Sequence, residues 1–99
     1  MGWATAHIAA LGRGETVSFR PRGNSMTGRV DSGALCTVEP SDASAVRPGD
    51  VVLCRVGAAE YLHIVKAIDA QGRCQIGNNK GRINGWTSKV FGRLVSVDP

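Results

Sequence analysis

Short runs of β-branched and other apolar residues, separated by turn-forming clusters, constrain the fold of this chain more than any other feature. The runs span residues 17–20, 35–39, 50–56, 60–69, 73–77 and 90–97. Between them lie clusters of Gly, Pro, Asn and Asp, which interrupt strands and favour turns. Because no second helical pattern accompanies them, the sequence predicts a compact, mostly-β fold.

The N-terminal stretch GWATAHIAALGRGE has a different pattern from the rest of the chain. Helix-forming residues continue up to Leu11, and Gly12 and Gly14 then act as stop signals. A length of 99 residues suits a single small domain. We therefore expect a short helix or flexible arm in residues 1–14 and a single β domain in residues 15–99.

Charge and hydropathy exclude several classes of protein. The net charge is +4, with 12 Lys and Arg against 8 Asp and Glu, and the cations are scattered. Scattered cations favour a solvated surface and at most a mild attraction to polyanions. The sequence has neither a secretory signal nor an apolar segment of membrane-spanning length, so we expect a cytoplasmic protein with no membrane span.

The cysteines and histidines do not form a metal-binding pattern. Cys36, Cys54 and Cys74 have no C-x-x-C pairing, and each lies in an apolar run. They are expected to be small buried hydrophobic residues, as is usual in a reducing compartment. His7 and His63 do not match the spacing of a zinc site, so neither a metal nor another cofactor is expected.

Ser25 is the candidate nucleophile, in the stretch RGNSMTG. Gly23 and Gly28 on either side of it allow backbone conformations that are closed to other residues and leave room for a substrate. A turn of this kind can direct backbone N–H groups at a developing oxyanion. Taken alone, however, the segment fits an ordinary polar turn better than a catalytic loop.

A nucleophilic serine needs a proton acceptor, and the segment YLHIVKAI offers two, His63 and Lys66. The two residues are three positions apart, so in a regular strand they point to opposite faces, and only one can reach Ser25 unless a bulge intervenes. A lysine base requires a pKa far below its usual value of about 10.4, whereas histidine titrates near neutrality without perturbation. Each residue also has a simpler interpretation, as a surface lysine and as a core histidine.

Five segments occur in an order that resembles a known superfamily: GNSM, VDSGALCTVEP, VRPGDVVLCRV, YLHIVKAIDAQG and VFGRLVSV. Together they are similar to the catalytic core shared by LexA-like self-cleaving repressors and signal peptidases, over about residues 19–97. The resemblance implies a compact LexA/signal-peptidase-like β-fold and makes Ser25 the nucleophile, with its N–H as an oxyanion donor. It also places Gly23, Asn24 and Met26 in the substrate-side loop.

The resemblance leaves the base open. Bacterial signal peptidases and the repressors use lysine, which corresponds to Lys66, and the endoplasmic-reticulum type uses histidine, which corresponds to His63. The H-x-V pattern and a naturally neutral pKa favour His63. Gly28 stands where the family usually has proline, and Ala34 where it has aspartate, which suggests a less-studied bacterial or phage-associated branch.

Two functions follow as expectations. The first is a soluble serine peptidase, an endopeptidase or a self-cleaving protein, which acts on a peptide or protein substrate held in extended form; a homodimer is among its expected assemblies. The second is a non-catalytic module on the same fold that contacts nucleic acid, through Lys80, Arg82 and Trp86, or a protein partner. Residues 77–86, GNNKGRINGW, are expected to form a loop in which Asn78 and Asn79 shape turns and Trp86 covers the core.

Overall fold

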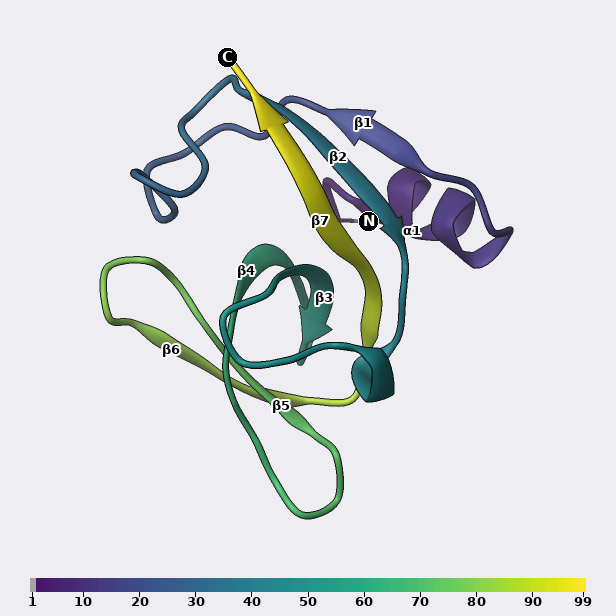
Figure 1. Ribbon diagram of the computed structural model, residues 1–99, viewed down its shortest axis with the longest axis vertical. Helices are drawn as coiled ribbons and strands as arrows, with labels where there is room; N and C mark the ends of the chain where they lie inside the picture. The colour runs from purple at the N-terminus through teal and green to yellow at the C-terminus, as the bar shows by residue number, and fades with distance from the viewer. Residues whose placement is uncertain (1) are drawn as a thin grey trace.

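A computed structural model describes residues 2–99 and confirms a mostly-β fold with one short helix. The strands form a single antiparallel sheet in the order β1-β2-β7-β3-β4-β5-β6 (Figure 1). The elements are α1 Thr5–Gly12, β1 Val17–Phe19, β2 Leu35–Pro40, the 3₁₀ turn η1 Ala43–Ala45, β3 Val51–Val56, β4 Ala59–Ile68, β5 Cys74–Gly77, β6 Ile83–Thr87 and β7 Val90–Asp98.

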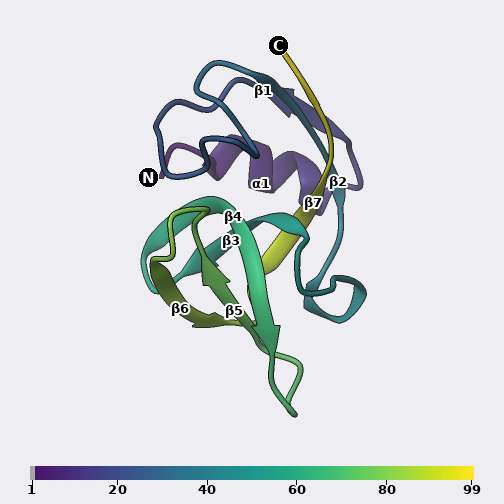
Figure 2. The ribbon, with the colours of Figure 1, turned by 60° about the vertical axis from the view of Figure 1, so that its left-hand side comes forward.

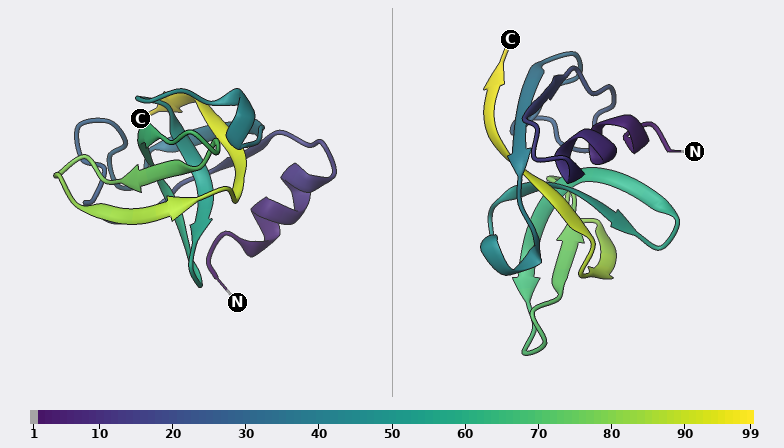
Figure 3. Two further views of the ribbon diagram at one scale, coloured as in Figure 1. Left: turned by 90° about the horizontal axis from the view of Figure 1, so that it is seen from below. Right: turned by 90° about the vertical axis from the view of Figure 1, so that its right-hand side faces the viewer.

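Helix α1 ends at Gly12, as the sequence predicts, and Gly14 then takes a φ of 84°. Only glycine adopts that conformation readily, so the chain can leave the helix there and turn toward β1. The helix packs against β1, β2 and β7, with Leu11 buried (Figure 3). The short helix therefore covers one part of the curled sheet.

Two apolar clusters hold the sheet together. One lies under α1 and includes Leu11, Met26, Val38 and Leu53, whereas the other is built around Val52 and Ile76. The three cysteines are free and fully buried within these clusters, as predicted. Burial raises the pKa of the Cys54 thiol to about 12, so this side chain packs as a neutral apolar group.

The expectation of a continuous loop over residues 77–86 is wrong. Ile83–Thr87 form strand β6, which pairs with β5 through Gln75↔Trp86 and Ile76↔Gly85. Asn84 and Gly85 have low strand propensity, so local sequence disfavours a strand that pairing with β5 nevertheless stabilises. The remaining loop spans residues 78–82, and the pairing of β5 with β6 shifts register between Ile76 and Gly77.

Two loops that are far apart in the sequence lie side by side (Figures 1 and 2). One, residues 20–34, joins β1 to β2; the other, residues 78–82, joins β5 to β6. The Asn79 N–H donates a hydrogen bond of 3.0 Å to the Ser25 carbonyl, which links them directly. No helix within residues 2–99 is long and apolar enough to cross a bilayer.

Candidate functional site

The Ser25 loop is held in a defined shape by its glycines and by a buried methionine. Gly23 and Gly28 have φ values of 122° and 96°, so both need the freedom that the sequence suggested. The Met26 carbonyl accepts hydrogen bonds from the N–H groups of Arg29 and Val30, at 2.9 and 2.7 Å, which closes a helical turn. Because the Met26 side chain is buried in the core, the neighbouring Ser25 is anchored at the edge of a cavity.

The loop between β5 and β6 braces the Ser25 loop. The Asn79 side-chain amide donates to the Thr27 carbonyl at 2.9 Å, in addition to the backbone bond to Ser25. Asn78 is buried, and its Oδ1 accepts the N–H groups of Lys80 and Arg82 at 2.8 and 2.9 Å. The turn role expected for the two asparagines is therefore observed, and Asn79 also ties the two loops together.

Ser25 and His63 are in hydrogen-bond contact. The Ser25 Oγ lies 3.0 Å from the His63 Nε2, and His63 projects from β4 with only 8% of its surface exposed. Burial lowers the pKa of the His63 imidazole, although the hydrogen bond to Asn84 acts in the opposite direction. The imidazole is therefore neutral at physiological pH and can accept the serine proton.

Asn84 orients the imidazole from the far side. Its Oδ1 lies 2.7 Å from the His63 Nδ1. A carbonyl oxygen can only accept, so Nδ1 carries the proton and Nε2 presents its lone pair to the Ser25 hydroxyl. Asn84 lies on β6, within the stretch that the sequence suggested to be a loop, and sequence reasoning did not select it. In the sequence, Asn84 stood out only as part of the NGW segment at the end of the expected loop.

Lys66 lies elsewhere on β4, at a β-bulge. The register shifts between Val65 and Ala67, so Lys66 is the extra residue of the bulged strand. Its half-buried side chain crosses Gly77 on β5, where a Cβ would come within 3.0 Å of the lysine Cε. Within residues 2–99, the hydrogen-bonded side chain at the Ser25 Oγ is that of His63 and not that of Lys66.

Backbone donors remain free beside the Ser25 hydroxyl. The N–H groups of Asn24, Ser25 and Met26 donate to no acceptor within residues 2–99. By contrast, the Gly23 N–H donates to the Ser32 Oγ at 3.2 Å, and the Asn24 carbonyl accepts the Thr27 hydroxyl at 2.9 Å. Gly23 and Asn24 thus help to shape the loop, and the N–H groups of Ser25 and Met26 have no hydrogen-bond partner in it.

A cavity of about 90 Å³ adjoins Ser25. Its apolar lining comes from Met26, Val30 and Leu62, and Trp3 from the N-terminal segment forms another wall. Leu62 precedes His63 on β4, so one strand supplies both the imidazole and a wall of the cavity. The cavity is large enough for a side chain of a few heavy atoms.

The side chains expected to contact a polyanion are at the surface. Lys80 and Arg82 are exposed, and Trp86 on β6 is 42% exposed instead of covering the core. The prediction of a core lid at Trp86 is therefore wrong. On β6, Asn84 is half-buried and lies against His63.

No known protein family, curated protein or solved structure matches this chain. Function is therefore inferred from the geometry of the site. That geometry joins a serine hydroxyl, a neutral imidazole and an amide in one hydrogen-bonded series.

Proposed function

We propose that this domain is a serine peptidase in which Ser25 is the nucleophile and His63 the general base. The observation that carries the proposal is the series Ser25 Oγ, His63 Nε2, His63 Nδ1 and Asn84 Oδ1, with separations of 3.0 and 2.7 Å. A nucleophile, a base and a third group that orients the base are the parts that activated serine requires. A histidine oriented by an asparagine also occurs in Cys-His-Asn peptidases.

The reaction proceeds through an acyl-enzyme. As the Ser25 Oγ attacks the peptide carbonyl carbon, His63 Nε2 takes the hydroxyl proton. The free N–H groups of Ser25 and Met26 stabilise the oxyanion of the tetrahedral intermediate. His63 then gives the proton to the departing amine, and the C–N bond breaks. A water molecule, deprotonated by His63, hydrolyses the ester and regenerates the Ser25 hydroxyl.

The LexA-like and signal-peptidase superfamily is the relationship that we propose for the chain. In support, a mostly-β fold carries the candidate serine in the loop between β1 and β2 and the candidate base on β4, in the order of the sequence motifs. The substrate is an extended peptide or protein segment. Strands β1 and β6 end the sheet, so each offers unpaired backbone groups that an extended segment can join.

Covalent labelling tests the proposal directly. The protein is incubated with a fluorophosphonate, and the modified residue is located by mass spectrometry. We expect one label on Ser25, no label in Ser25→Ala, and normal labelling in the matched control Ser88→Ala, which alters an exposed serine beside β6. Ser25→Ala should also abolish cleavage of a peptide library and leave the melting temperature nearly unchanged. Absence of both labelling and cleavage in the unmodified protein would contradict the proposal.

The alternative function is a non-catalytic module that binds nucleic acid. It is favoured by the exposure of Lys80, Arg82 and Trp86 around one loop, together with the net charge of +4. Binding through phosphate contacts must weaken as salt rises. Titration of single- and double-stranded DNA at low and high salt tests it, and no binding at low salt would remove it.

A further inference from the structure

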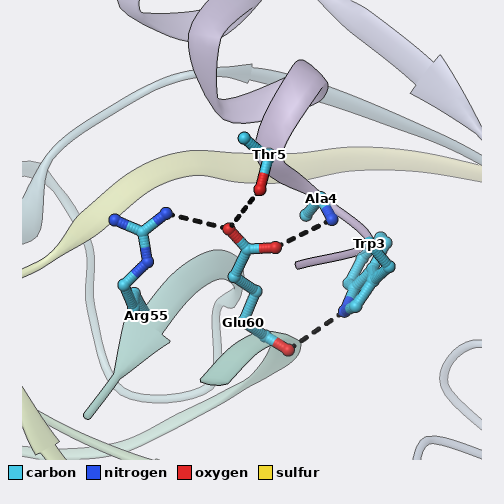
Figure 4. Close-up of polar contacts among 5 residues, drawn as sticks. All are labelled: Trp3, Ala4, Thr5, Arg55 and Glu60. Carbon is cyan, nitrogen blue, oxygen red and sulfur yellow. Dashed lines mark hydrogen bonds and ion pairs between the residues drawn. The ribbon is translucent and has the colours of Figure 1, made fainter. Parts of the chain in front are cut away.

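The segment before α1 is fastened to β4 by a nearly enclosed carboxylate. The Glu60 side chain is 3% exposed. Its Oε1 accepts the Ala4 N–H at 2.9 Å, and its Oε2 accepts the Arg55 guanidinium at 2.8 Å and the Thr5 hydroxyl at 3.2 Å (Figure 4). An ionised carboxylate with three donors is a strong anchor, so it fixes the N-terminal segment on the strand that carries His63.

Trp3 is held in place from two sides, although it is 52% exposed. Its Nε1 donates to the Glu60 carbonyl at 3.0 Å, as Figure 4 shows. Its ring also makes an edge contact with Phe19 on β1, at 5.6 Å between centroids. A tryptophan on the surface that is fixed by a hydrogen bond and an aromatic contact presents a rigid apolar wall.

Trp3 borders two hollows. Trp3, Pro21 and Arg22 line the cavity of about 90 Å³ beside Ser25. The same three residues line a second hollow of about 340 Å³, which continues toward His7 and Phe19. The two hollows are therefore neighbours that share Trp3 as part of their boundary.

We propose that Trp3 determines the specificity of this site and that Glu60 positions it, an inference that rests on the proposed peptidase function. A substrate side chain next to the scissile bond enters the cavity beside Ser25 and meets the indole. The wall admits side chains that fit about 90 Å³ and excludes longer and aromatic ones. Without the indole, the cavity opens into the second hollow, and larger side chains fit.

Three substitutions test the wall in different ways. Trp3→Ala removes it. Glu60→Gln weakens its anchor, because the neutral amide loses the charge-assisted bonds to Ala4 and Arg55. Gly2→Ala leaves both residues intact and displaces the segment, because a Cβ on residue 2 would overlap the Glu60 carboxylate. Trp86→Ala is the matched control: another tryptophan exposed to a similar extent, which lines neither hollow.

The experiment measures binding separately from chemistry. Each variant is combined with Ser25→Ala, and peptides that differ at one position (Ala, Val, Leu or Phe) are titrated by NMR. Cleavage of the same peptides is measured with Ser25 present. We expect Trp3→Ala to raise the preference for Phe over Ala by about tenfold or more in both measurements, the range that pocket discrimination supplies. Glu60→Gln and Gly2→Ala should shift it in the same direction, and Trp86→Ala should not.

The outcomes separate the two proposals. Cleavage with a Phe-to-Ala preference that Trp3→Ala leaves unchanged would overturn the role of Trp3 and leave the peptidase proposal standing. Peptide binding that depends on Trp3 without any cleavage would do the reverse. Failure of the peptides to bind or be cleaved would overturn both. If Glu60→Gln does not fold, Trp3→Ala and Gly2→Ala still decide the matter.

Discussion

The Asn84 Oδ1 lies 2.7 Å from the His63 Nδ1, so β6, at one edge of the sheet, holds the imidazole that faces Ser25. Asn84→Ala removes the acceptor that fixes the tautomer and the ring orientation. We expect kcat/KM to fall by roughly 10-fold to 100-fold, less than the 10²–10⁴-fold that a general base itself supplies. Steady-state cleavage by Asn84→Ala and by its exposed neighbour variant Trp86→Ala gives the comparison. Equal activities would show that Asn84 is not a positioning residue.

Asn84→Asp tests the same contact through pH. In the unmodified protein the pKa of His63 is lowered by burial, so kcat/KM should rise with pH at a midpoint below the ordinary value of 6.5. A carboxylate beside Nδ1 stabilises the imidazolium and raises the pKa, so the rise should move to higher pH. A pH–rate profile of both proteins checks the direction. A profile that stays in place or moves to lower pH would contradict the orientation assigned to His63.

His63→Ala and Lys66→Ala should differ sharply. The His63 Nε2 is bonded to the Ser25 hydroxyl, whereas Lys66 lies at a bulge against Gly77. We expect loss of the base to lower kcat by about 10²-fold to 10⁴-fold, and loss of the lysine to affect mainly solubility or stability. Cleavage rates, read beside the thermal unfolding of each variant, decide between them. Greater loss of activity in Lys66→Ala would reverse the assignment of the base.

Substitution of the two asparagines in the loop between β5 and β6 should have different effects, Asn78 mainly on the free energy of unfolding and Asn79 mainly on the conformation of the Ser25 loop. Asn78→Ala removes a buried oxygen that accepts two hydrogen bonds, from the N–H groups of Lys80 and Arg82, and should cost about 1–3 kcal/mol of unfolding free energy, since each bond contributes about 0.5–1.5 kcal/mol. Asn79→Ala removes an exposed bond to the Thr27 carbonyl and should cost only about 0.5 kcal/mol.

The labelling rate of Ser25 should nevertheless fall in Asn79→Ala, because the brace on its loop is lost. Urea unfolding and fluorophosphonate labelling measure the two effects. A labelling rate unchanged in Asn79→Ala would show that the Ser25 loop keeps its shape without the brace.

The ionisation of Glu60 makes the free energy of unfolding depend on pH in the acid range. The bond from Arg55 and the donors of Ala4 and Thr5 lower the pKa of the Glu60 carboxyl below its ordinary value of 4.5. Its contribution is therefore fully present above about pH 4.5 and is lost as the pH falls through the lowered pKa. Glu60→Gln should destabilise the protein at pH 7 and make the decrease in unfolding free energy between pH 7 and pH 3 smaller. Urea unfolding at pH 7 and pH 3 measures the difference, and parallel losses in the two proteins would contradict it.

Local signals in the sequence were sufficient for most of the fold. Gly12 and Gly14 ended the helix as predicted, and the apolar runs became strands. Burial alternates along β2, whereas β3 and the middle of β4 are continuous, largely apolar runs that are buried on both faces. Gly23 and Gly28 take positive φ in the Ser25 loop, as their backbone freedom suggested, whereas the role assigned to Ser25 depended on the resemblance. Each of these features is determined by residues close to one another in the chain.

The missed parts depend on partners that are distant in sequence. Strand β6 has weak propensity and is stabilised by pairing with β5, so its sequence reads as a loop. Asn84 was missed with it. The choice between His63 and Lys66 could not be made from alternation, since it depends on the bulge in β4 and on how the Ser25 loop meets the sheet.

Strand β6 also has a consequence for the native-state dynamics. It pairs only with β5, and edge strands open at lower free energy than the centre of a sheet. Opening β6 would release Asn84 from His63 while β3, β4 and β7 stay paired. Hydrogen exchange should therefore be faster in β6 than in β3. On heating, peptide cleavage should be lost at a temperature below the midpoint of global unfolding.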